Sequence, residues 1–120
     1  MEGSIVGKFI KLMADYSSTG LWCEYGTNLG PHNLPVSKEL HERIRLWCEE
    51  YEKNDDWLPI DERSGVFDLR LFAANGLEIA KAIKEELPDW TVIYFDEYEL
   101  DRQYLNAHHN RDAYVYEVIL

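Results

Sequence analysis

Apolar and polar residues alternate in two short segments near the N-terminus. Residues 5–13 are mostly apolar, with Lys8 and Lys11 interrupting the run, and residues 21–25 follow after a Ser-Ser-Thr-Gly turn. Alternation on either side of a short turn predicts two strands in an antiparallel hairpin. Residues 26–35 contain two Gly, two Asn and two Pro, and this composition predicts a loop.

Two segments in the middle of the chain have the period of an amphipathic helix. In residues 37–52, apolar side chains recur at positions that share one helical face: Leu40, Ile44, Trp47, Cys48 and Tyr51. Ser37 is a suitable N-cap for this helix. A second segment of the same kind runs from Asp68, its expected N-cap, to the residue before Pro88.

The C-terminal third predicts two further strands. Residues 91–95 are β-branched or aromatic throughout, which is typical of a central strand. Residues 96–110 are acidic and tyrosine-rich and give no clear period, whereas residues 113–120 alternate. The order ββααββ predicts a single α+β domain over residues 1–120, with a four-stranded, mainly antiparallel sheet and two helices packed on one face.

The segment between the two predicted helices, residues 53–66, is long for a connection in a small domain. It is polar and carries Pro59 and Gly65 as helix breakers. Connections of this length are often functional. We expect three apolar residues inside it to hold it against the body of the protein: Trp57, Leu58 and Ile60.

The charge balance narrows the range of partners. The 120 residues include 23 Asp and Glu against 12 Lys and Arg, a net charge of −11. Such an excess repels phosphate backbones and anionic lipid surfaces, so we expect no nucleic-acid and no membrane partner. It attracts basic proteins. Acidity that only maintains solubility is the alternative interpretation.

Acidic residues gather in two clusters, one from Glu49 to Glu62 and one from Asp96 to Asp101, and large aromatic residues lie within or beside both. Aromatic anchors ringed by charge are typical of a protein interface. We therefore predict contacts with a basic protein partner from six residues: Asp55, Asp56, Trp57, Glu97, Tyr98 and Asp101. The alternative is a solvated surface whose aromatic side chains fold inward.

No motif places catalytic or metal-binding residues at a specific spacing. His108 and His109, with Asp96 nearby in the sequence, are the first candidates for such chemistry. Adjacent His side chains usually diverge, and no His-x-x-x-His or Cys-x-x-Cys pattern is present. We predict no metal, no cofactor and no catalytic residue. A small enzyme or ligand-binding domain with a site near these three residues is the alternative function.

Cysteine content and the absence of targeting patterns point to the cytoplasm. Cys23 and Cys48 are a single distant pair, which is not a disulfide framework. The sequence shows neither the pattern of a signal peptide at its start nor an apolar run of ~20 residues. We expect a soluble cytoplasmic protein, and a homodimer built through the edge strands stays open as a further possibility.

In its size, acidity, α+β pattern and supply of aromatic residues, the chain resembles the small immunity proteins that bacteria make against toxic nucleases or other effectors. These proteins form a functional class that spans many folds. The resemblance implies a binding protein that blocks a toxin or an enzyme by occlusion, with a basic partner.

Overall fold

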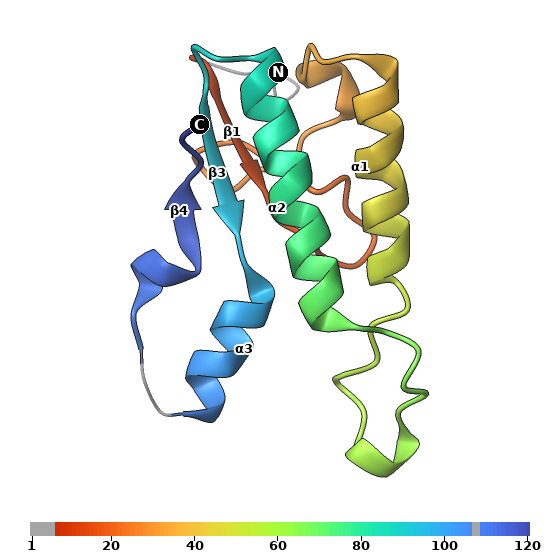
Figure 1. Ribbon diagram of the computed structural model, residues 1–120. Helices are drawn as coiled ribbons and strands as arrows, with labels where there is room; N and C mark the ends of the chain where they lie inside the picture. The colour runs from red at the N-terminus through yellow and green to blue at the C-terminus, as the bar shows by residue number, and fades with distance from the viewer. Residues whose placement is uncertain (1–6, 107–108) are drawn as a thin grey trace.

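Four short strands form one mixed sheet in the computed structural model, which describes residues 7–106 and 109–120 (Figure 1). They are ordered β2-β1-β3-β4 in space. Their bounds are β1 (Phe9–Leu12), β2 (Leu21–Trp22), β3 (Thr91–Phe95) and β4 (Val115–Glu117). The two outer pairs are antiparallel and the central pair, β1 and β3, is parallel.

The parallel central pair corrects the prediction of a mainly antiparallel sheet, although the four-stranded α+β class is confirmed. Two helices of opposite direction carry the chain from β2 back to the end of the sheet where β1 begins. There Lys8 forms an ion pair with Asp89, and the Thr91 N–H donates to the Lys8 carbonyl oxygen at 2.7 Å. β3 therefore starts beside the start of β1 and runs in the same direction, as a crossover connection requires.

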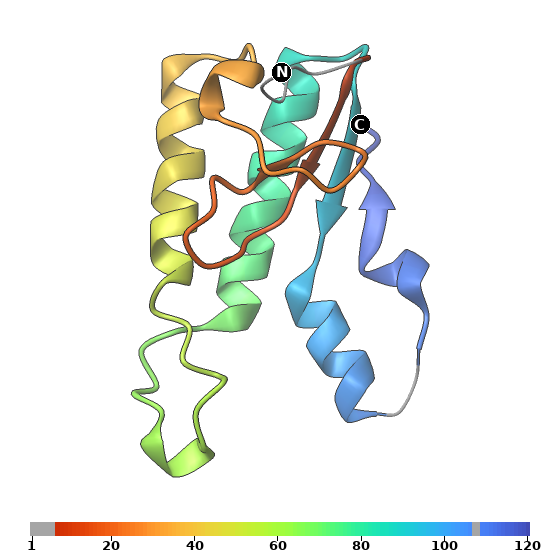
Figure 2. The same cartoon turned by 180° about the vertical axis from the view of Figure 1, so that it is seen from behind.

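Both predicted helices are present, as α1 (Lys38–Tyr51) and α2 (Leu69–Glu86), on the same side of the sheet (Figures 1 and 2). Ser37 caps α1 by accepting from the Leu40 N–H at 3.2 Å. Asp68 caps α2 by accepting from the Leu71 N–H at 3.0 Å. α2 lies over the strands, and α1 packs alongside α2.

A third helix, α3 (Glu97–Leu105), corrects the predicted order of elements to ββααβαβ. Asp96 caps it by accepting from the Glu99 N–H at 3.0 Å. Among its residues only Gln103 is buried, so the helix has no apolar stripe to reveal its period. Three short 3₁₀ turns complete the structure: η1 (Pro31–Asn33), η2 (Ile60–Glu62) and η3 (Arg111–Ala113).

α2, α1 and the sheet come into close contact in one part of the core. The Trp47 indole stacks on the Phe72 ring with centroids 4.5 Å apart and donates to the Phe72 carbonyl oxygen at 3.0 Å. The Tyr94 hydroxyl donates to the Ala73 carbonyl oxygen at 2.6 Å. Gly76 lies between them, and a Cβ there would collide with the Tyr94 hydroxyl and lie 2.5 Å from the Trp47 ring. The missing side chain lets the three elements approach closely.

Candidate protein-binding surface

The two acidic clusters of the sequence meet at one end of the structure. The Tyr51 hydroxyl, in the last turn of α1, donates to the Glu97 carboxylate in the first turn of α3, at 2.9 and 2.8 Å from its two oxygens. Burial raises the pKa of Glu97, and repulsion from three other carboxylates adds to the rise although the Tyr51 hydrogen bond opposes it. Those carboxylates belong to Asp15, Asp56 and Asp101. The structure thus brings Asp56, Glu97 and Asp101 together.

Two further residues of this surface were not among the six predicted contacts, although Glu52 belongs to the first predicted acidic cluster. Asp15 follows β1, and Glu52 follows α1, where its carboxylate accepts from the Ser17 N–H at 2.8 Å. The Tyr16 hydroxyl donates to the Asn54 carbonyl oxygen at 2.6 Å, which fixes the turn after β1 against the end of α1. No local pattern predicts that contact. We call the resulting surface the acidic end: Asp15, Glu52, Asp55, Asp56, Glu97 and Asp101.

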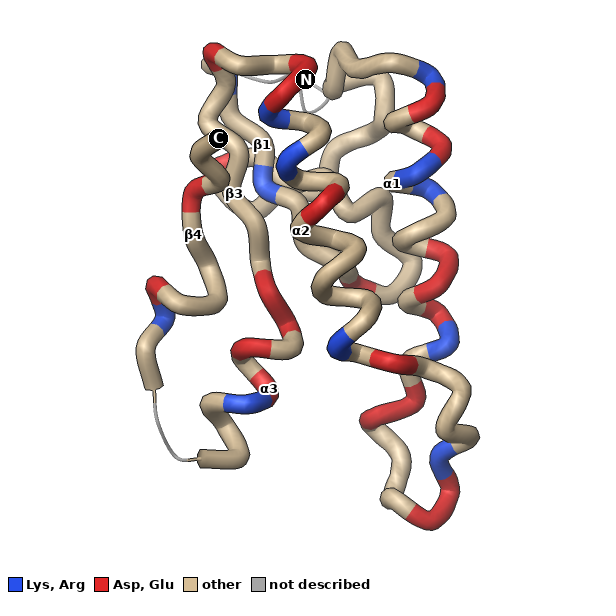
Figure 3. The backbone as a smooth tube through the Cα atoms, viewed as in Figure 1, with Lys and Arg blue, Asp and Glu red and all other residues tan. Residues whose placement is uncertain are grey.

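The described carboxylates of the acidic end form no salt bridges to Lys or Arg, although a hydrogen bond from the Ser64 N–H and, to a smaller extent, the charge of Arg63 lower the pKa of Asp55. Within residues 7–106 and 109–120, none of the six forms an ion pair with Lys or Arg. Figure 3 shows acidic positions gathering at the lower end of α1 and at the start of α3. Burial raises the pKa of the Tyr16 phenol, and the charges of Glu97 and Asp56 raise it further. This end of the protein therefore carries an excess of negative charge.

A cluster of packed aromatic rings lies next to the acidic end. The Tyr51 ring lies 4.9 Å from the Tyr16 ring and 5.3 Å from the Phe72 ring, measured between centroids. The Phe67 ring packs edge-on against Tyr51 at 5.9 Å. Rings in contact at these distances hold one another in fixed orientations. The hydrogen bonds from Tyr51 therefore tie the Glu97 carboxylate to this cluster of packed rings.

The loop between α1 and α2 projects from the acidic end; of the three apolar residues expected to hold it against the body, Leu58 is half-buried, but Trp57 and Ile60 are exposed. The Trp57 side chain is 73% exposed and Ile60 is 81% exposed. Polar contacts fix the loop instead: Asp55 accepts from the Ser64 N–H at 2.7 Å, and Arg63 donates to the carbonyl oxygens of Leu58 and Asp56 at 2.9 and 2.7 Å. The loop therefore presents its largest apolar side chains to solvent.

The second projection at this end is α3. Tyr104 and Leu105 in its last turn are 76% and 78% exposed, and Asp101 is exposed one turn earlier. Tyr98 is half-buried. Both projections extend in the same direction beyond the end of α1, as Figures 1 and 2 show from opposite sides. Exposed apolar tips thus flank the acidic residues, an arrangement typical of a protein-binding surface.

A protein family described as Serratia CdiI immunity protein-like matches residues 8–97, from just before β1 to the first residue of α3. The chain belongs to this family. No curated protein matches it. Membership confirms the resemblance to immunity proteins, and it gives the chain a general role in toxin immunity, with a toxin as its partner.

The alternative site near the histidines gains no support in this immunity protein. Asp96 is engaged as the N-cap of α3, His109 is exposed, and His108 lies outside the described residues. Among the residues that the structure describes, no three His, Cys, Asp or Glu side chains are grouped so as to hold a metal ion.

Both cysteines of the immunity protein are free thiols. Cys48 is buried on the inner face of α1, and burial, with a smaller effect of Glu52, raises its pKa to about 11. Burial also acts to raise the pKa of Cys23, but hydrogen bonds from the N–H groups of Thr27 and Tyr25 outweigh it, so this pKa is lowered. No helix in the described part of the chain is long and apolar enough to cross a bilayer.

Proposed function

We propose that this immunity protein neutralises a basic toxin by covering part of the toxin's surface with the acidic end. The observation that carries the proposal is a group of six carboxylates drawn from three segments of the chain, without an ion pair to Lys or Arg among the described residues. Carboxylates left uncompensated beside exposed aromatic residues suit a partner that supplies the cations.

Each of the predicted contact residues has a distinct part in this proposal. Asp56, Glu97 and Asp101 face the partner's Lys and Arg side chains. Trp57 is the apolar anchor, because a large exposed ring in an ordered loop loses little conformational entropy on binding. Asp55 acts through the loop that its bond to Ser64 holds in shape, and the half-buried Tyr98 ring on α3 contributes apolar contact area.

Electrostatic attraction raises the association rate of such an interface more than its affinity. The net charge of −11 steers a basic toxin toward the protein, and salt screens this steering. We place the encounter in the cytoplasm, where thiols such as Cys23 and Cys48 stay reduced. Occlusion then requires that the bound protein covers the site on which the toxin's own substrate binds.

The first test defines the toxin by function: it is the protein whose effect on growth this chain cancels when both are expressed in one bacterial cell. With the purified pair, calorimetry at rising salt should show an association constant that falls steadily. An association that is independent of salt, or that strengthens with it, would contradict the role of the acidic end.

Occlusion has its own test. The substrate of the toxin and the immunity protein should compete, so the apparent Kd of the immunity protein rises in proportion to substrate concentration. Simultaneous binding of both, with the same Kd at every substrate concentration, would show that neutralisation proceeds without covering the substrate site.

A further inference from the structure

The outer edge of β4 has main-chain groups that point away from the sheet. β4 is the last strand in the order and, among the described residues, pairs only with β3. The Val118 N–H donates to the Val92 oxygen at 2.8 Å, and the Asp96 N–H donates to the Tyr114 oxygen at 2.7 Å. Since bonding direction alternates along an antiparallel strand, the N–H and C=O groups of Val115 and Glu117 point outward. Figure 1 shows this edge at the side of the molecule.

The opposite edge of the sheet is closed by the protein itself. The Leu29 N–H donates to the Leu21 carbonyl oxygen at 2.8 Å, and the Asn28 amide donates to the same oxygen at 2.9 Å. Natural sheets cover, charge or pair their edges, because an open edge accepts further strands. At β4 no described segment provides cover, and Ile119 just beyond the strand is 78% exposed.

We propose that β4 pairs antiparallel with β4 of a second copy of this chain, joining two sheets into one of eight strands. The inference goes beyond the proposed function, because it concerns a different surface and does not involve the toxin. It also decides which edge strand a homodimer uses.

The pattern of outward groups selects the register. With Val115 opposite the partner's Glu117, the outward N–H and C=O groups of both residues are satisfied by four hydrogen bonds between the copies. A shift of two residues toward the C-terminus places Glu117 opposite the partner's Glu117, and like charges directly opposite are destabilising. A shift in the other direction leaves only Val115 paired, because β4 begins there.

The side chains also suit this register. Tyr116 lies opposite the partner's Tyr116, and each packs edge-on against its own Tyr94 with ring centroids 6.1 Å apart. Aromatic pairs across neighbouring strands stabilise a sheet. A strand of three residues gives a small interface, so the association is weak.

Charge gives the dimer a distinct dependence on salt. Each copy carries a net charge of −11, so the copies repel one another and screening strengthens their association. The sign is opposite to that expected for binding a basic toxin. Dimer formation and toxin binding can therefore be tested in separate experiments.

Sedimentation equilibrium of the full chain, without toxin, from about 10 μM to about 1 mM tests the dimer. The mass should rise from 14.1 kDa toward twice that value, and further at high salt. Glu117→Pro removes one outward N–H without breaking a bond to β3, so this variant should stay monomeric. Lys38→Pro, a proline in the first turn of α1, is the matched control and should dimerise as the parent does.

A monomeric mass at the highest concentration and salt, or unimpaired dimerisation of Glu117→Pro, would overturn the proposal. If Glu117→Pro does not fold, amide hydrogen exchange on the parent chain replaces it. Exchange of the Val115 and Glu117 N–H groups should slow as concentration rises, and constant exchange rates would reject the pairing. Toxin neutralisation by a folded Glu117→Pro variant should be unchanged, which keeps this result separate from the proposed function.

Discussion

The outer face of α1 and the acidic end are both rich in carboxylates, but Glu42 and Glu49 on α1 are paired with Arg45, whereas the carboxylates of the acidic end form no ion pairs in the described structure. On α1, Arg45 pairs with Glu42 at 2.6 Å, three residues earlier, and with Glu49 at 2.8 Å, four residues later on the same helix. At the acidic end, Asp56 and Glu97 come from separate segments and have no such pair in the described structure. Exposed pairs within a helix contribute little and leave little field beyond the surface.

This comparison distinguishes carboxylates whose charge is already neutralised within the protein from carboxylates whose charge can interact with a partner. Burying a carboxylate among other carboxylates opposes folding: burial raises the pKa of Glu97 most, and the charges of Asp56, Asp15 and Asp101 add to the rise. A protein can keep such a surface when binding uses it. We therefore expect changes at the acidic end to affect the toxin, and changes in the core to affect stability alone.

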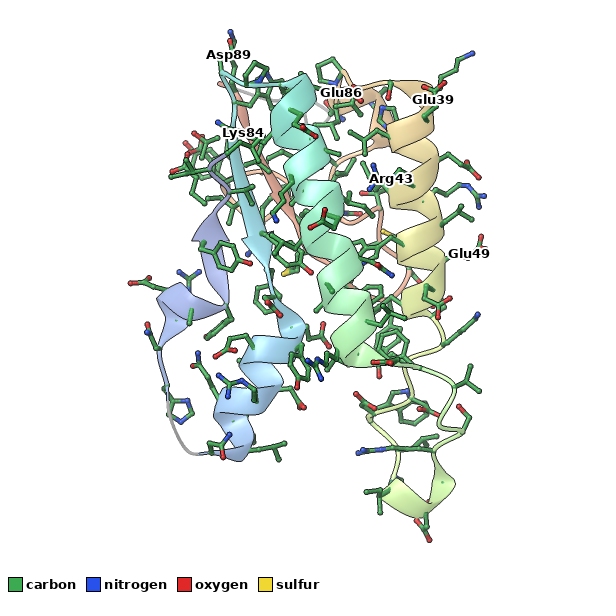
Figure 4. All side chains as sticks on the ribbon, viewed as in Figure 1. Glu39, Arg43, Glu49, Lys84, Glu86 and Asp89 are labelled. Carbon is green, nitrogen blue, oxygen red and sulfur yellow. The ribbon has the colours of Figure 1, made fainter. Side chains whose placement is uncertain are left out.

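The largest effect should come from reversing charge at the acidic end. Asp56→Lys with Asp101→Lys should lower toxin affinity about 100-fold or more, because two attractive contacts become repulsive. Calorimetry measures the affinity, and circular dichroism checks the fold. Glu39→Lys with Glu85→Lys changes the net charge equally at the opposite end of the helices (Figure 4 labels Glu39). Equal losses from both double variants would mean that only net charge matters.

A substitution in the core should lower the stability of the fold without changing toxin affinity. Gly76→Ala places a Cβ against the Trp47 ring and the Tyr94 hydroxyl, so the free energy of unfolding should fall by about 1–3 kcal/mol. Denaturant melts measure this change. Toxin affinity well below the melting temperature should stay the same. Asn75→Ala, at an exposed position of α2, is the control and should stay within about 0.5 kcal/mol of the parent.

Trp57 should matter to binding and not to folding. Trp57→Ala removes the exposed anchor of the loop, and toxin affinity should fall about 10-fold. The free energy of unfolding should change by less than about 0.5 kcal/mol. Tyr25→Ala removes an aromatic side chain that is 83% exposed outside the acidic end, and it should change neither quantity. A loss of stability without a loss of affinity in Trp57→Ala would reverse the assignment of this loop.

The smallest effect should be a pH-dependent gain of stability in Glu97→Gln. Burial and neighbouring carboxylates raise the pKa of Glu97 in the folded state, so its ionisation opposes folding. This penalty is absent below the ordinary carboxyl pKa and complete above the raised folded value. Glu97→Gln keeps an acceptor for Tyr51, so its melting temperature should exceed that of the parent slightly near neutral pH. The difference should vanish as pH falls to about 4. A difference independent of pH would point to packing instead.

The parts of the fold with a strong local signal could be predicted from the sequence. The bounds of α1 and α2 predicted from their apolar faces and capping residues agree with the observed bounds to within one residue. α3 has a cap, Asp96, followed three residues later by Glu99, but only Gln103 is buried, and burial is what makes a period visible. The parallel pairing of β1 and β3 depends on the path of two helices, which no local pattern records.

Most residues of the candidate surface could be predicted from the acidic runs of the sequence, but their proximity and the inclusion of Asp15 could not. Asp56 and Glu97 belong to conspicuous acidic runs, but their proximity follows from the contact between Tyr51 and α3. Asp15 stood alone in the sequence and joins them because the Tyr16 hydroxyl bonds to the end of α1. The exposure of Trp57 could not be read from its hydrophobicity, since polar bonds hold its loop in place.

The most direct test of the central claim is amide hydrogen exchange of this protein with and without its toxin. We predict that the toxin slows exchange in residues 52–66 and 96–105, and leaves the first turn of α1 and the Leu21–Trp22 strand unchanged. Protection confined to those distant segments, with the acidic end as open in the complex as in the free protein, would contradict the account.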